Sequence, residues 1–333
     1  MEQEFLLEIN DLSIQYKTDA GVTNAVNHLN LKVRKGETVG FVGETGAGKT
    51  TTALGIMRLV PSPPGEITGG EIFFKGENLL EKNIKDMRLI RGDQIAMIFQ
   101  DPMTSLNPIM RVGDQIAEVI KLHQNLNKDE IRKKTIEMLE LVGIRPERVD
   151  DYPHEFSGGM KQRVVIAMAL ACNPSLLIAD EPTTALDVTI QAQVLELMRD
   201  LQSQFRTSTI MITHDLGVVA ELCDHVAVIY AGSVVEYGTV DQIYNNTRHP
   251  YTIGLFESIP SLDEEKDLKA IEGMPPDPTH LPSGCHFHPR CPYATERCAK
   301  EVPGSYEIGE GQTVSCFLYD PEHPMEKKEV SAS

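Results

Sequence analysis

The 333-residue sequence contains no run of about 18 apolar residues, the length that a helix needs to cross a bilayer. Its first residues, 1–5, lack the basic segment and apolar core of a secretory signal peptide. Basic residues are also scarce, with 31 Lys and Arg against 49 Asp and Glu and a net charge of −18. We therefore expect a cytosolic protein that reaches a membrane only through a partner and does not bind nucleic acid.

The sequence has no internal repeat, and its length favours two domains. Apolar and polar residues alternate in residues 6–16 and 28–33, as they do in the strands of a sheet, and a turn-like segment lies at 17–22. Further short apolar stretches predict strands at 38–42, 95–99, 176–179, 209–212 and 226–230. Helical patterns fall at 50–59, 112–122 and 128–142, and at 190–205, where Ile190, Val194, Met198, Leu201 and Phe205 share one face. This alternation predicts an α/β fold with a mostly parallel sheet covered on both sides.

Two segments depart from the alternation. Between about residues 101 and 165 the helical patterns follow one another with no strand between them, which predicts a helical insertion. After about residue 260 a charged run at 263–267 is followed by prolines at 275, 276, 278, 282, 289 and 292, which exclude regular helix. We therefore predict a domain at 1–260 and a small C-terminal extension at 261–333.

A complete phosphate loop of the form GxxxxGK[ST] follows the predicted strand 38–42 and opens the helix 50–59. Its glycines allow backbone N–H groups to turn toward the phosphates of a bound nucleotide, helped by the positive end of the helix. Lys49 would neutralise phosphate charge, and the Thr50 hydroxyl would ligate Mg²⁺. The predicted ATP-binding residues here are Gly43, Glu44, Thr45, Gly46, Ala47, Gly48, Lys49, Thr50 and Thr51.

Two carboxylates, Asp180 and Glu181, end the apolar strand 176–179. At the carboxyl edge of a sheet that carries a phosphate loop, such residues have natural roles. Asp180 would hold the hydrated Mg²⁺, and Glu181 would act as the general base that activates the attacking water. The alternative is a solvated acidic turn, since Asp-Glu-Pro also occurs at ordinary strand ends.

The ordered series of motifs resembles the nucleotide-binding subunit of an ABC transporter over about residues 5–260. Residues 157–162, Ser-Gly-Gly-Met-Lys-Gln, resemble the signature motif, and Ala185-Leu186-Asp187 resemble the D-loop. The resemblance implies a P-loop ABC cassette with an N-terminal antiparallel β subdomain and an inserted helical subdomain. It implies that Tyr16 stacks on adenine, that Gln100 contacts Mg²⁺ and links it to a membrane partner, and that His214 is the switch histidine. Thr45 and Phe156 depart from the usual serine and leucine, and neither change removes a ligand group.

The signature residues also carry a physical argument of their own. Ser157, Gly158 and Gly159 open the apolar run 164–170, so they form a second helix N-terminus that offers N–H groups to an anion. The phosphate loop already encloses the nucleotide of this chain. We therefore expect Ser157, Gly158, Gly159 and Gln162 to contact the ATP of a facing subunit, so that two chains clamp two ATP molecules.

Three segments narrow the resemblance to importers of the oligopeptide, dipeptide and nickel group: residues 100–108, residues 249–252 and the tail 284–292. Membership would imply a second ATPase subunit, in a heterodimer or alternatively a homodimer. It would also imply two transmembrane permease subunits and, indirectly, an extracellular solute-binding protein. The chain would then lie on the cytoplasmic face of the cell membrane and power peptide import, or alternatively import of nickel or another solute.

Four of the six cysteines, Cys285, Cys291, Cys298 and Cys316, fall within 32 residues of the predicted extension. A reducing cytosol opposes disulfides, so a metal site is the stronger interpretation. Zinc is one candidate, but a tight Cys-x-x-Cys pair is absent and the gaps are 5, 6 and 17 residues. Wider gaps suit an iron–sulfur cluster, and the resemblance to the importer tail implies a [4Fe–4S] cluster on these four residues. His286 and His288 are expected to be neighbours of that site and not ligands.

Two other functions compete with an importer ATPase. A soluble ABC ATPase acting on ribosomes or DNA would be expected to carry two cassettes, a long coiled-coil insertion or a basic surface. A metal-sensing regulator with a vestigial ATPase is disfavoured by intact Lys49, Glu181 and His214.

Overall fold

The structure is a computed structural model, and it describes residues 5–19, 21–184, 186–258 and 270–323. The chain divides into two compact units, and each unit is built from three separate segments of the sequence. The first unit comprises residues 1–6, 33–39 and 78–222, and the second comprises 7–32, 40–77 and 223–333. The predicted boundary near residue 260 lies outside the described residues, so the division at that point remains a prediction.

The first unit contains three parallel strands, β6 (Ile95–Ile98), β7 (Leu176–Asp180) and β8 (Ser208–Ile212), in the order β6–β7–β8. Every residue of β7 and β8 is buried, as expected for parallel strands covered on both faces. Helix α7 (Val188–Phe205) buries Val194, Met198 and Leu201, which confirms the apolar face read from the sequence. The unit also contains α2 (Ile84–Ile90) and α8 (Leu216–Leu222).

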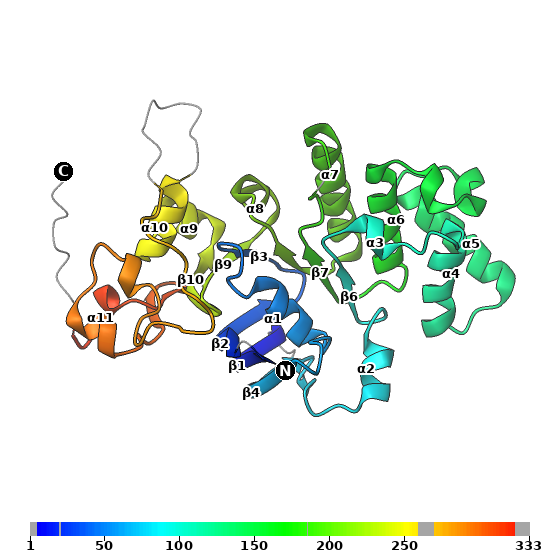
Figure 1. Ribbon diagram of the computed structural model, residues 1–333. Helices are drawn as coiled ribbons and strands as arrows, with labels where there is room; N and C mark the ends of the chain where they lie inside the picture. Colours follow the sequence, from blue (N-terminus) through cyan, green and yellow to red (C-terminus); the bar gives the residue numbers. More distant parts are fainter. Residues whose placement is uncertain (1–4, 20, 185, 259–269, 324–333) are drawn as a thin grey trace. The chain divides into compact units, whose positions relative to one another are not determined.

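A helical group connects β6 to β7, with no strand between them among the described residues. Its members are α3 (Pro102–Ser105), α4 (Val112–His123), α5 (Lys128–Leu141), two short 3-10 helices (Pro146–Asp150 and Pro153–Glu155) and α6 (Gly158–Leu170). Figure 1 shows α4, α5 and α6 packed side by side, with α3 against α6. Helix α5 begins at a capping box in which Asn127 and Glu130 satisfy each other's backbone N–H groups. The predicted helical insertion is thereby confirmed.

The second unit contains an antiparallel sheet in the order β2–β1–β4–β5, with β1 (Phe5–Thr18), β2 (Gly21–Arg34), β4 (Gly65–Phe74) and β5 (Glu77–Asn78). Helix α1 (Lys49–Ile56) packs closely on β1, because a Cβ at Gly55 would lie 2.7 Å from Ile14 Cδ1. The predicted turn at 17–22 is too long: β1 continues to Thr18, where Lys17 N–H donates to Pro64 O (2.8 Å), and β2 begins at Gly21.

The second unit also holds an antiparallel series of strands, β9 (His225–Tyr230), β10 (Ser233–Thr239), β12 (Gln312–Val314) and β11 (Tyr306–Gly309). Strand β3 (Thr38–Val42) is fully buried and leads into the phosphate loop. The helices are α9 (Val240–Asn245), α10 (Pro250–Glu257) and α11 (Glu296–Lys300). Two 3-10 helices, η3 (His288–Arg290) and η4 (Phe317–Tyr319), complete the unit, and β11 and β12 join the C-terminal extension to β10.

No helix among the described residues is both long and apolar enough to span a membrane. The strands predicted at 38–42, 95–99, 176–179, 209–212 and 226–230 are all present as β3, β6, β7, β8 and β9. Strands β4, β10, β11 and β12 were not predicted, and they are antiparallel in the pairings that the structure gives. The parallel pairings β6–β7 and β7–β8 therefore lie in the first unit, and these antiparallel pairings lie in the second unit.

Candidate ATPase site

The phosphate loop lies in the second unit, where neighbouring backbone leaves no room for side chains at two of its glycines. A Cβ at Gly43 would lie 2.2 Å from Ile229 O, and one at Gly48 would lie 2.3 Å from Ala25 O. Both residues also have positive φ, 150° and 99°, which favours glycine. The glycine spacing that predicted the loop is therefore required by the fold around it.

Lys49 is buried at the start of α1, and its ammonium group is held by the loop itself. Its Nζ donates to Gly43 O (2.7 Å) and to Glu44 O (3.0 Å). Thr45, Gly46 and Thr50 are exposed. Tyr16 lies half-buried near the end of β1 in the same unit. Ala47 is buried, and its carbonyl accepts from Gly232 N–H (2.9 Å).

Glu181 lies in the first unit, directly after β7, and three side chains converge on its carboxylate. Gln100 Nε2 donates to Oε2 (2.8 Å), and Thr184 Oγ1 donates to the same oxygen (2.9 Å). His214 Nδ1 lies 3.4 Å from Oε1. The structure thus brings together Gln100, Glu181 and His214, which lie far apart in the sequence.

The backbone and charge of Glu181 are both unusual. Its φ is 47°, in the left-handed region, and its N–H donates to Ile212 O on β8 (2.8 Å). Burial alone would raise the pKa of this carboxyl, but hydrogen bonds from Thr184, His214 and Gln100 outweigh burial and lower the pKa below its usual value. The carboxylate is therefore ionised at neutral pH and accepts hydrogen bonds that fix its direction.

The neighbouring acidic residues have different surroundings. Asp180 is 3% exposed and is the last residue of β7. Asp187 caps α7 by accepting from Ile190 N–H (3.1 Å). Ala185, the first residue of the predicted D-loop, lies outside the described residues.

The signature residues form the N-terminus of α6, as predicted. Ser157 is the N-cap, and its Oγ accepts from Met160 N–H (3.4 Å). Gly158 is exposed, whereas a Cβ at Gly159 would lie 2.4 Å from Ile190 Cγ2 of α7. Gln162 is fully buried, and both polar atoms of its side chain lack a hydrogen-bond partner. As placed, its side chain cannot touch a nucleotide outside this chain, so the predicted contact would require it to move.

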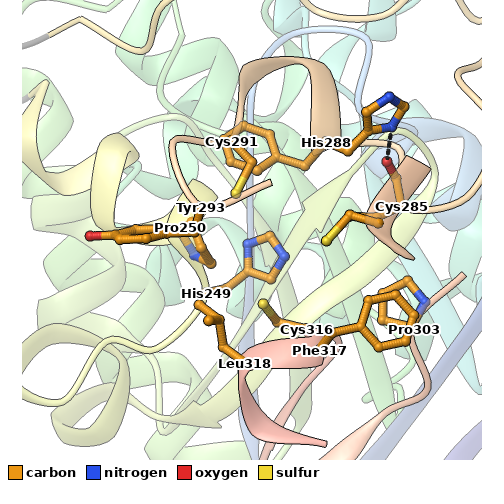
Figure 2. Close-up of a pocket in the computed structure, with 12 residues that line it drawn as sticks. His249, Pro250, Cys285, His288, Cys291, Tyr293, Pro303, Cys316, Phe317 and Leu318 are labelled. Carbon is orange, nitrogen blue, oxygen red and sulfur yellow. Dashed lines mark hydrogen bonds between the residues drawn. The ribbon is translucent and has the colours of Figure 1, made fainter. Parts of the chain in front are cut away.

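All four cysteines of the predicted metal site line one small cavity in the second unit. Figure 2 shows the sulfur atoms of Cys285, Cys291 and Cys316 turned toward a common space beside His249. Cys285 N–H donates to Cys298 O (2.8 Å), which fixes these two segments against each other. Aromatic and aliphatic side chains cover the rest of the cavity, among them Phe287, Tyr293, Phe317 and Leu318. The structure therefore gathers residues that are up to 31 positions apart in the sequence (285 to 316).

The chemistry of these thiols fits a thiolate-ligated group. All six cysteines, which lie within the described residues, are free. Burial raises the pKa of Cys285, of Cys291 to about 11 and of Cys316 to about 12, so loading would displace protons. Within the described residues, no three or more His, Cys, Asp or Glu side chains are arranged to hold a single metal ion. The cysteines thus offer four free thiols around one cavity, but within the described residues they are not arranged as a metal-ion site.

Several residues near these sites received no role from the sequence. Thr184 binds Glu181, and Tyr251 Oη accepts from Glu44 N–H (2.9 Å). Arg290, which lies in the tail 284–292 but was given no role of its own there, pairs with Glu44 (2.7 Å). His249 is buried beside the cysteines, and its Nδ1 accepts from Tyr251 N–H (3.0 Å) as the N-cap of α10. Burial lowers the pKa of His249 to about 3, so this imidazole is neutral.

Comparison with known proteins agrees with these motifs. The ABC transporter family matches residues 26–184, and the oligopeptide/dipeptide transporter C-terminal region matches residues 235–298. The chain is similar to the oligopeptide transport ATP-binding protein OppD of Bacillus subtilis, with 54% identity over 96% of this chain and 90% of that protein. It is also similar to OppD of Escherichia coli (49% identity; 95% and 94% covered) and to the dipeptide transport ATP-binding protein DppD of B. subtilis (48%; 95% and 96%).

Among solved structures, the fold is similar to the dimeric structure of MJ0796, a bacterial ABC transporter cassette. The TM-score is 0.63 at 26% identity, and the match covers 70% of this chain and 98% of that one. A second structure of MJ0796 in a post-hydrolysis state, bound to ADP and phosphate, matches with the same TM-score at 25% identity. The match confirms the predicted ABC cassette fold.

Proposed function

Because this chain belongs to the ATP-binding proteins of the ABC transporter family, in the group with an oligopeptide/dipeptide transporter C-terminal region, we propose that it hydrolyses ATP to power peptide import. The observation that carries the proposal is the carboxylate of Glu181, ionised and aimed by Gln100, Thr184 and His214. Such a group has the basicity and the fixed direction that a general base needs.

In the proposed reaction, Glu181 accepts a proton from a water molecule as the water oxygen attacks the γ-phosphorus. The bond from that phosphorus to the bridging oxygen breaks, and ADP leaves with the electron pair. His214, whose ring nitrogen faces Glu181 Oε1, orients the carboxylate and the phosphate. Lys49 and the loop 43–51 hold the phosphates, and Tyr16 stacks on adenine. Thr50, Asp180 and Gln100 would be the ligands of Mg²⁺, and the ion would supply positive charge to the phosphate oxygens.

The signature residues support a dimeric arrangement. We assign Ser157, Gly158, Gly159 and, after a rearrangement, Gln162 to the ATP of a facing subunit, because the N-terminus of α6 is a ready anion site. The structures of MJ0796 are dimeric, which agrees with this assignment. We propose a heterodimer with a second ATPase subunit, peripheral at the cytoplasmic face of the membrane. Two permease subunits and, indirectly, an extracellular solute-binding protein would complete the transporter.

Contact with a permease subunit is assigned to the exposed loop after β6. Asn107 is exposed, while its backbone N–H and C=O are both held by the buried side chain of Gln115 (2.8 and 3.0 Å). Ile109 beside it is 83% exposed. A photo-crosslinker placed at Asn107 should capture a permease subunit in the membrane. Crosslinking only to other proteins would refute this assignment.

The function is tested by transport. The chain is purified with its membrane partners, reconstituted in vesicles with ATP on the side of this subunit, and supplied with its solute-binding protein. Peptides should be taken up and should stimulate phosphate release, and Glu181→Gln should abolish both. Uptake of nickel without uptake of peptides would instead show that the transporter imports nickel. ATP hydrolysis that follows ribosomes or DNA, without uptake, would refute the transport function.

We further propose that Cys285, Cys291, Cys298 and Cys316 hold a [4Fe–4S] cluster that orders the proline-rich extension. The cluster would supply covalent cross-links in a segment that has few apolar residues to bury. Anaerobically purified protein should be brown, with iron and acid-labile sulfide in equal amounts. Cys298→Ser should bleach it, and Cys223→Ser, outside the cavity, should not. Colourless protein with one stoichiometric zinc would decide for a zinc site.

A further inference from the structure

Glu44, the second residue of the phosphate loop, is tied to its surroundings at three points. Its N–H donates to Tyr251 Oη (2.9 Å), and its carbonyl accepts from Lys49 Nζ (3.0 Å). Its carboxylate is bound by Arg290 of the C-terminal extension. Any displacement of Glu44 therefore moves a hydrogen-bond acceptor of the lysine that is proposed to receive the phosphates.

The pair between Glu44 and Arg290 is bidentate and partly shielded from water. Arg290 Nη1 donates to Oε2 (2.7 Å), and Nη2 donates to Oε1 (3.0 Å). The side chain of Arg290 is only 5% exposed, and that of Glu44 is 28% exposed. A pair with this geometry and shielding is stronger than an exposed surface ion pair, which contributes little.

Arg290 itself has little freedom to move. Its Nε donates to Glu272 O (3.1 Å), and Nη1 lies 3.4 Å from Tyr230 Oη. The guanidinium also lies over the rings of Tyr230 and Phe287, at 5.8 and 6.0 Å. Lysine cannot reproduce this planar, multiply bonded arrangement. The arginine is thus a fixed positive charge that the extension presents to the phosphate loop.

The position of Arg290 depends on the cysteine-lined segment. Arg290 ends the short helix η3, where its N–H donates to Phe287 O (3.0 Å), and Cys291 follows directly. The ring of Phe287 packs against Tyr230 and Tyr251 at 5.2 and 5.5 Å. The extension therefore reaches Glu44 by two routes, through Arg290 to the carboxylate and through Tyr251 to the backbone N–H.

The charge at this position has a direct consequence for a polyphosphate ligand. An unpaired carboxylate within a phosphate loop repels the phosphates that the loop must accept. We propose that Arg290 is a positioning residue for the phosphate loop, which neutralises and fixes Glu44 and so sets the affinity of this subunit for ATP. The inference rests on the proposed ATP site and assigns to the extension a role in nucleotide binding.

The test is a double-mutant cycle on the full-length chain purified without oxygen. Binding of the slowly hydrolysed analogue ATPγS with Mg²⁺ is measured by calorimetry for wild type, Arg290→Met, Glu44→Gln and the double variant. Arg290→Met should raise Kd by on the order of tenfold, as expected for the loss of a charge-assisted pair. Glu44→Gln in the same chain should restore Kd to within about threefold of wild type, because the neutral amide needs no countercharge. A purely structural role for Arg290 would not produce this rescue.

Arg297→Met is the matched control, since Arg297 also belongs to the extension, binds the carboxylates of Asp320 and Glu301 and lies over Phe317. Its Kd should equal that of wild type. Equal losses in both arginine variants, an unchanged Kd in Arg290→Met, or no rescue in the double variant would each overturn the inference.

If Arg290→Met shows no cooperative thermal unfolding, that variant is not folded, and the single variant Glu44→Gln then tests the inference. With Arg290 retained and no carboxylate left in the loop to repel the phosphates, Glu44→Gln should bind ATPγS at least as tightly as wild type. Weaker binding would overturn the inference. Wild-type protein that does not bind ATPγS at all would refute the proposed ATP site itself, a result distinct from any difference among the variants.

Discussion

Replacing Glu181 by glutamine isolates the basicity of this side chain from its shape. The amide oxygen can occupy the position of Oε2 and accept from Gln100 and Thr184, as the carboxylate does at 2.8 and 2.9 Å. The amide nitrogen then faces His214 Nδ1, which can accept a hydrogen bond in the neutral ring. The left-handed backbone at φ 47° is retained, because both side chains are unbranched at Cβ. The substitution therefore changes the proton affinity at this position and little else.

The loss of a general base reduces a rate by about 10²–10⁴-fold, equivalent to about 3–5 kcal/mol in the activation barrier. We expect phosphate release by the assembled transporter to fall by at least this range for Glu181→Gln, with ATP affinity within about twofold of wild type. With ATP and Mg²⁺, the variant should accumulate as a nucleotide-bound dimer in gel filtration. Glu221→Gln, an exposed carboxylate of α8 paired with Arg199, serves as the control and should hydrolyse normally. Hydrolysis by Glu181→Gln at the wild-type rate would refute the assignment of the base.

Three further results are expected. Lys49→Ala should raise Kd for ATP on the order of tenfold or more in calorimetry, because phosphate charge is left unpaired; unchanged affinity would contradict the assigned role. Ser157→Arg should suppress hydrolysis in the dimer while the isolated subunit binds ATP normally. Loss of ATP binding by the isolated subunit would show that Ser157 contacts the ATP of its own chain, against the assignment. Because the pKa of His249 is about 3 in the folded chain and about 6.5 when unfolded, its contribution to stability is lost as pH falls below 6.5. Denaturant titrations from pH 6 to 4 should show His249→Asn losing up to about 1.4 kcal/mol less per pH unit than wild type; equal slopes would contradict the shift.

The strands that carry the site were predictable because each is a short apolar run next to a motif. Strand β4 was missed because it contains Gly65, Glu66, Gly69, Gly70 and Glu71, residues of types that are depleted in strands. Strand β10 was missed because its burial does not alternate, and the register shift opposite β9 disturbs the period. The local sequence therefore predicts a strand only where the β-propensity of its residues and their pattern of burial both favour one.

For the site, sequence order and resemblance selected Gln100, Glu181 and His214, and the structure shows these side chains meeting. Thr184 was not selected, although it lies only three residues from Glu181, because threonine after a strand is a common turn residue. The contact between Arg290 and Glu44 could not be predicted from local sequence, because the two residues lie 246 positions apart. The burial of Gln162 likewise depends on packing between helices, which a motif does not specify.

The interleaving of the two units has a consequence for synthesis of the chain. Residues 78–222 of the first unit are contiguous, whereas the second unit combines early residues, 7–32 and 40–77, with residues after 222. At about 5–20 residues per second, Arg290 leaves the ribosome roughly 12–50 s after Glu44. During that interval the emerging phosphate loop lacks both Tyr251 and Arg290. A chain interrupted before residue 290 would therefore carry the whole phosphate loop without the side chain that neutralises Glu44.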